Sequence, residues 1–115
     1  MDVEAIRRFC LSFPQATENL QWGEDLCFKI NGKIFATVNL DVSSNVRIVF
    51  KCTPEQAAEL VERPGISPAP YVGRYHWVAL ESLETLGSSE LKDCIRNSYE
   101  LISKAVKRKR AGKSS

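Results

Sequence analysis

Two runs of alternating apolar residues around the pair Asn31-Gly32 constrain the fold of this chain more than any other feature. Before the pair, Cys27 and Lys29 alternate with three apolar residues: Leu26, Phe28 and Ile30. After the pair, Phe35, Thr37 and Asn39 alternate with four apolar residues: Ile34, Ala36, Val38 and Leu40. Asn-Gly is the pair that best tolerates the positive φ angles of a type I′ turn. The pattern therefore predicts a β-hairpin over residues 26–40.

The segments on either side of the hairpin predict helices and further strands. Helical spacing and N-cap residues predict three helices, from about Asp2 to Ser12, from Thr53 to Pro64 and from about Ser88 onward. Alternation of apolar residues predicts strands at 46–52 and 76–81. Several prolines and glycines predict a loop at 63–75, and the segment 82–87 is ambiguous between a strand and a turn. We expect a single α+β domain of order α-β-β-β-α-β-(β)-α, with helices packed on one face of a largely antiparallel sheet.

The length of 115 residues and the composition, 43% hydrophobic and 26% charged, are those of one ordinary globular domain. No apolar run approaches the roughly 20 residues of a membrane span, and the first residues lack the basic and apolar regions of a secretory signal. We therefore expect a cytoplasmic monomer without a membrane partner. Its four cysteines contain no CxxC pair, so we expect reduced thiols and no metal site.

Charge is distributed unevenly along the chain. Six of the sixteen basic residues lie between Lys104 and Lys113, whereas acidic residues outnumber basic ones before them. We therefore divide the chain into a folded domain, 1–103, and a basic C-terminal tail, 104–115. Such a tail either attracts phosphate backbones or is a solvated helix end whose cations suit the helix dipole.

No catalytic pattern is present in the sequence. His76 is the single histidine, and neither a nucleophile elbow nor a phosphate-binding glycine loop occurs. We expect a protein that is not an enzyme and uses no cofactor.

The predicted outward face of the sheet is basic. If the apolar residues of the strands point inward, four bases point outward beside Phe35, Thr37, Asn39 and Val49: Lys29, Lys33, Arg47 and Lys51. Bases interleaved with an aromatic are typical of phosphate-contacting surfaces. The alternative is an ordinary solvated sheet face on which Trp22 or the loop 63–75 covers Phe35. A large aromatic on such a face requires either a cover or a partner.

A second cluster lies around the proline-rich loop. Tyr71, Tyr75 and Trp77 surround Arg74 there. These residues form either an aromatic binding patch or an anchor that holds the loop to the core.

In this order and spacing, several short motifs resemble the MmcQ/YjbR family of small, mainly bacterial proteins. The motifs are Phe13-Pro14, Phe28-Lys29, Gly32-Lys33-x-Phe35, Lys51 before Thr53-Pro54-Glu55, Pro68 with Tyr71, His76-Trp77 and Ser98-Tyr99. The resemblance runs from the first helix to Tyr99. It implies a compact α+β fold grouped with secretion-chaperone-like domains, and DNA binding through a winged surface. The chain departs from the family at Gly73-Arg74-Tyr75, where many members carry an Asn-Lys or similar polar pair.

Three functions remain open on these grounds. The first is binding of double-stranded DNA, with phosphate contacts from Lys29, Lys33, Arg47, Lys51 and Arg74. The second is a chaperone-like protein-interaction module that captures a protein segment with Phe35, Tyr71 and Trp77. The third is a small-molecule pocket between the loop 63–75 and the sheet.

Overall fold

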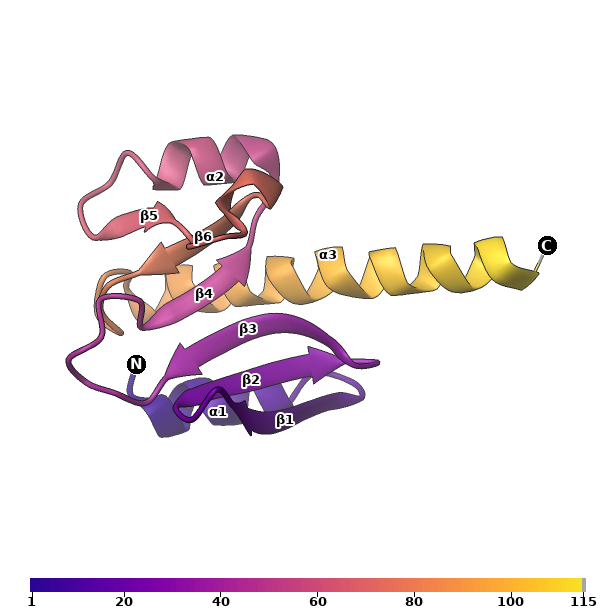
Figure 1. Cartoon of the computed structure of the whole chain (residues 1–115), viewed down its shortest axis with the longest axis horizontal. Helices are drawn as coiled ribbons and strands as arrows, with labels where there is room; N and C mark the ends of the chain where they lie inside the picture. Colours follow the sequence, from indigo (N-terminus) through magenta and orange to yellow (C-terminus); the bar gives the residue numbers. More distant parts are fainter. Residues whose placement is uncertain (115) are drawn as a thin grey trace.

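The computed structural model describes the backbone of residues 1–114 and the side chains of residues 1–106. Its elements are α1 (Val3–Leu11), β1 (Ala16–Gln21), β2 (Asp25–Ile30), β3 (Lys33–Asn39), β4 (Ile48–Lys51), α2 (Pro54–Leu60), β5 (Ile66–Pro68), the 3-10 turn η1 (Gly73–Tyr75), β6 (Trp77–Leu80) and α3 (Ser88–Ser114) (Figure 1). The side chains of the predicted basic tail beyond Val106 lie outside the described residues.

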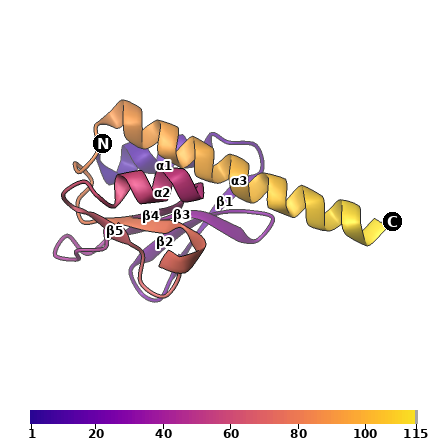
Figure 2. The ribbon, with the colours of Figure 1, turned by 90° about the horizontal axis from the view of Figure 1, so that it is seen from above.

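The strands form one antiparallel sheet in the order β1-β2-β3-β4-β6-β5. Figure 2 shows that α1, α2 and α3 all lie on the same side of this sheet. The core lies between the two layers and includes Ile6 from α1, Val38 and Phe50 from the sheet and Ile95 from α3. The expected α+β fold, with helices on one face of an antiparallel sheet, is confirmed.

The local signals for the first two helices and the hairpin are also confirmed. The Asp2 carboxylate accepts a hydrogen bond from the Ala5 N–H, and the Thr53 hydroxyl accepts one from the Gln56 N–H. Asn31 and Gly32 have φ angles of 50° and 78°, as a type I′ turn requires.

The structure contains two strands, β1 and β5, that the sequence did not predict. It also lacks a strand at 82–87, which was one of the two alternatives for that segment. β1 contains a single large apolar residue, Leu20, and alternates weakly because it lies at the sheet edge. β5 lies inside the predicted loop 63–75 and spans three residues. The ambiguous segment 82–87 forms turns and bends without a strand.

A β-bulge in β3 places Phe35 on the opposite face of the sheet from the one that the sequence predicted. The register shifts between Phe28 and Lys29, so that Phe28 pairs with Ala36 and Lys29 pairs with Ile34. Phe35 is therefore the extra residue on β3, and a shift of one residue changes which face a side chain occupies. Phe35 is fully buried on the helix side, whereas Ile34 lies on the open face.

Phe35 is packed by two family-motif residues. Its ring makes edge-to-face contacts with Phe13 and Tyr99, at centroid distances of 6.0 and 5.2 Å, and those two rings stack on each other at 4.5 Å. The Tyr99 hydroxyl also donates a 2.7 Å hydrogen bond to the Pro14 carbonyl. Phe35 is therefore part of the core that fixes α3, and the prediction that it contacts a partner from the open face is wrong.

The neighbouring Ser98 joins α3 directly to the sheet. Its hydroxyl donates a 2.6 Å hydrogen bond to the Phe35 carbonyl and accepts a 2.9 Å bond from the Lys51 N–H. The ladder between β3 and β4 begins only one residue further on, where Ala36 pairs with Phe50. Ser98 thus satisfies two backbone groups that the bulged strand leaves unpaired.

The two edges of the sheet differ. β1 forms one edge with six residues, whereas β5 forms the other with three and carries Pro68, which has no N–H to donate. Within the described part of the chain, no helix combines the length and apolar character needed to cross a membrane.

Candidate binding groove

The sheet face opposite the helices contains a groove of about 620 Å³. Its floor is built from outward residues of β3 and β4, including Ile34, Thr37 and Val49. One wall is Trp22, in the turn between β1 and β2, and the other is Trp77 of β6 with the loop residues Pro70, Tyr71 and Val72. The groove is thus mainly apolar and aromatic.

Trp22 and Tyr71 on opposite walls share two unusual properties. Their relative exposures are 73% and 99%, and their φ angles are 50° and 68°, in the left-handed region. Bulky residues rarely adopt this region, because the Cβ atom approaches the following carbonyl oxygen. Neither position gains much by burial, so folding alone does not explain an aromatic residue there.

One end of the groove carries a carboxylate held in place by its neighbours. Asn39 donates a 2.9 Å hydrogen bond from Nδ2 to Asp25 Oδ1, and its own Oδ1 accepts a 2.8 Å bond from the Asp41 N–H. Gln21 pairs with Asp25 across the strands. The Oε1 atom of Gln21 is buried and has no hydrogen-bond partner.

Two lysines border the opposite end of the groove without lining it. Lys29 is half-buried and pairs with Ile34, four residues along β2 from Asp25, which corresponds to about 13 Å of strand. Lys51 pairs with Trp77, and its ammonium lies 5.8 Å from the centroid of that ring and donates a 3.0 Å hydrogen bond to the Tyr75 carbonyl. The groove is therefore polarised along its length.

The predicted phosphate-contacting residues do not form one accessible patch. Arg47 is only 8% exposed, and its Nε donates a 3.0 Å hydrogen bond to the Asn39 carbonyl, so its predicted exposed position is wrong. Arg47 precedes β4, and the alternation used to place it does not extend that far. Lys33 is exposed but pairs with the core residue Ile30, so its predicted place on the outward face is wrong. Arg74 is exposed, and its guanidinium lies 4.8 Å from the centroid of the Tyr75 ring.

The structure brings together two of the three predicted partner-binding aromatics, Tyr71 and Trp77, but not Phe35. Sequence reasoning missed Trp22 as a groove residue and Asp25 as its polar group. The available signal was the Trp22-Gly23 pair between β1 and β2, because a glycine beside a tryptophan marks a tight turn that presents the ring.

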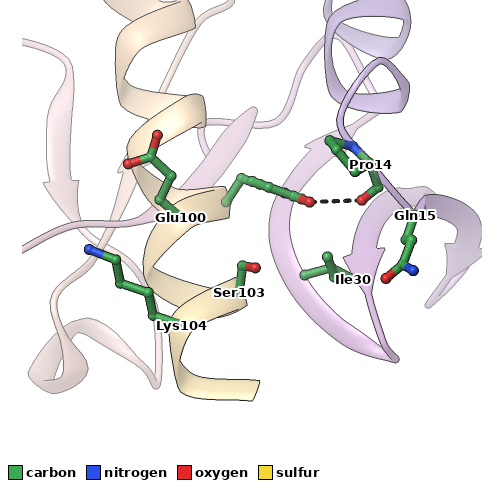
Figure 3. Close-up of a pocket in the computed structure, with 7 residues that line it drawn as sticks. Pro14, Gln15, Ile30, Glu100, Ser103 and Lys104 are labelled. Carbon is green, nitrogen blue, oxygen red and sulfur yellow. Dashed lines mark hydrogen bonds between the residues drawn. The ribbon is translucent and has the colours of Figure 1, made fainter. Parts of the chain in front are cut away.

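A second hollow, of about 520 Å³, lies on the helix side (Figure 3). Ser103 and Lys104 of α3 line it together with Pro14, Gln15 and Ile30. The hydrogen bond from Tyr99 to Pro14 crosses this space, so the hollow belongs to the packing that fixes α3.

The cysteines do not form a reactive centre among the described residues. Burial raises the pKa of the Cys10 and Cys52 thiols to about 12 and that of Cys94 to about 11. Burial also raises the pKa of Cys27. Within the part of the chain that the structure describes, no three His, Cys, Asp or Glu side chains are grouped so that they could hold a metal ion.

The antiparallel sheet with one helix layer and one grooved open face defines a small two-layered α+β domain. The sequence model of the YjbR family matches residues 11–101, and the chain belongs to this family. No curated protein matches the chain significantly.

Solved structures share the same architecture. A Deinococcus radiodurans protein with the domain family DUF419 is 25% identical and superposes with a TM-score of 0.77, over 89% of this chain and 78% of its own. A Pseudomonas syringae protein is 21% identical, with a TM-score of 0.69 over 88% of this chain and 98% of its own, and supports the fold alone.

Proposed function

We propose that this protein acts by binding alone, as an interaction module whose open-face groove holds an extended segment of a partner protein. The observation that carries this proposal is the pair Trp22 and Tyr71, two exposed aromatics in left-handed conformations on opposite walls of an apolar groove. Backbone strain of this kind concentrates at binding sites, where it is retained for function.

The shape of the groove favours a protein segment over a small molecule. Sites for small apolar ligands enclose most of the ligand surface, whereas Tyr71 here is 99% exposed. Tryptophan and tyrosine are the residues that contribute most to protein interfaces, since they bury large areas at little entropic cost. An extended segment lying between the two walls would cover both rings.

A peptide selection tests this proposal. A random peptide library displayed on phage is selected on the full chain, and the enriched peptide is labelled with fluorescein and titrated by anisotropy. We expect the Trp22→Gly and Tyr71→Gly variants to bind it about tenfold or more weakly, because each loses an interface aromatic. Glycine adopts both φ angles without strain, so these variants keep the fold.

Tyr75→Ala is the matched control. Tyr75 is a half-exposed tyrosine close to Tyr71 in the sequence, and it does not line the groove. Equal losses in all three variants, or full affinity after Tyr71→Gly, would contradict a site in the groove.

Double-stranded DNA is the second candidate partner. It is favoured by Arg74, which is exposed, and by Lys29, which is half-buried on the open face. Binding of a labelled duplex should then fall steeply with salt and survive truncation after residue 103. A flat salt response, or binding that disappears with residues 104–115, would remove the sheet face from consideration as a DNA site.

A further inference from the structure

We infer that the Asp25 end of the groove recognises a basic side chain, a lysine or an arginine, of the bound segment. This inference rests on the proposed function and names the chemistry that selects the partner. It follows from the charge, the hydrogen bonds and the aromatic surroundings of Asp25.

Among the side chains of residues 1–106, Asp25 is a positioned carboxylate without a cation. It is half-buried, and Asn39 occupies Oδ1 and is itself held by the Asp41 backbone. None of the ion pairs among the described side chains includes Asp25. A carboxylate that protein donors fix from one side only retains acceptor capacity for a ligand on the other.

The acceptors that reach the groove are those of Asp25 and Asn39. Gln21 lies directly across from Asp25, but its Oε1 atom is buried and Gln21 does not line the groove. The Asp25 carboxylate is therefore the charged acceptor that a ligand in the groove can reach. A lysine ammonium or an arginine guanidinium supplies donors and no acceptor.

The aromatic walls suit the same ligand group. Trp22 and Tyr71 line the groove together with Asp25. Ring faces attract an ammonium or guanidinium, and the aliphatic stem of lysine or arginine covers apolar surface while its charge reaches the carboxylate.

The far end of the groove fixes the direction of the segment. Lys29 and Lys51 border that end, paired with the lining residues Ile34 and Trp77. A basic side chain placed at that end would be repelled, whereas a carboxylate would be attracted. The groove therefore selects segments whose basic residue lies at the Asp25 end and whose acidic or uncharged residues lie at the Lys51 end.

Parallel selections test this inference. The same random phage library is selected on the wild-type chain, on Asp25→Asn and on Asp25→Lys. We expect one position of the enriched peptides to be occupied by Lys or Arg on the wild type, to lose that preference on Asp25→Asn and to become Asp or Glu on Asp25→Lys. Asp25→Asn preserves the acceptor for Asn39, and Glu24→Gln, an exposed neighbour outside the groove, should leave the preference unchanged.

A second measurement does not depend on a protein variant. Replacing the basic residue of the enriched peptide by norleucine should weaken its binding to the wild-type chain about tenfold. Enriched peptides that depend on Tyr71 but have no basic preference, or that tolerate norleucine, would overturn the inference and leave the proposed function intact. If no peptide is enriched on the wild-type chain, both fail.

Discussion

At the scale of the single residue, the backbone conformations of Trp22 and Tyr71 destabilise the folded state. A left-handed conformation costs a non-glycine residue about 1–2 kcal/mol, and neither ring is buried enough to offset this cost. Replacing either residue by glycine should therefore weaken partner binding but leave the stability of the fold unchanged or increased.

Trp22→Gly and Tyr71→Gly should leave the free energy of unfolding unchanged or raise it by up to about 1 kcal/mol, because relief of strain exceeds the entropic cost of glycine. Urea denaturation followed by circular dichroism measures this change. Trp77→Ala is the contrast: Trp77 is half-buried in β6, and we expect its loss to lower stability by about 1 kcal/mol or more. A large loss of stability in the two glycine variants would show that their rings support the fold.

Sequence reasoning was uneven at the residue scale. It placed Tyr71 and Trp77 in an aromatic cluster, and both line the groove. It misplaced Phe35 and Arg47, because period-two alternation holds only along a regular strand. A bulge interrupts the strand at Phe35, and Arg47 lies before the first residue of β4.

At the scale of elements, Ser98 joins α3 to two strands. Its hydroxyl satisfies the Phe35 carbonyl and the Lys51 N–H at the point where the bulge separates β3 from β4. The family motif Ser98-Tyr99 therefore has a structural role, since Tyr99 stacks on Phe13 and binds the Pro14 carbonyl.

Ser98→Ala should lower the free energy of unfolding by about 1–3 kcal/mol, because it leaves two backbone groups unsatisfied in the core. Chemical denaturation measures the loss. Ser103 is a half-buried serine further along α3 whose hydroxyl makes no hydrogen bond to the described residues, so Ser103→Ala should change stability by less than about 0.5 kcal/mol. If the two substitutions had equal effects, the hydrogen bonds of the Ser98 hydroxyl to β3 and β4 would not contribute to stability.

The elements that the sequence predicted best are those with strong local signals. The hairpin has a turn pair that accepts positive φ, and α1 and α2 begin at capping side chains. β1 lacked such a signal because an edge strand with one face in solvent needs few apolar residues. The sequence predicted a pocket between the loop 63–75 and the sheet, and the groove lies there. Its Trp22 wall was not predictable, because only the sheet brings Trp22 opposite Tyr71.

The whole molecule buries four thiols, and its stability should depend on pH for that reason. The pKa values of Cys10, Cys52 and Cys94 are about 12, 12 and 11 in the folded protein, against roughly 8.5 for a free thiol. Well below pH 8.5, near neutral pH, these thiols are protonated in both states and do not make stability depend on pH. As pH rises through about 8.5 towards the folded values, only the unfolded chain ionises, and stability is lost.

Between pH 7.5 and pH 9.5 the free energy of unfolding should therefore fall by about 1.4 kcal/mol for each of these three thiols. Denaturation with urea at both pH values measures the fall, and Cys10→Ala should remove one contribution although it lowers stability at neutral pH. A thiol-specific reagent should react with the cysteines only after unfolding. Rapid labelling of the folded chain at neutral pH would contradict this account.

The unequal edges of the sheet limit how copies of this protein can associate. β1 ends the sheet with six residues, of which alternate ones turn their N–H and C=O groups away from β2, whereas β5 ends it with three residues and a proline. Strand pairing between copies can use β1 against β1, and each copy has one such edge. Pairing by this route uses the one long edge of each copy and therefore ends at a dimer with a continuous sheet; alternatively, β1 accepts a single added strand from another protein.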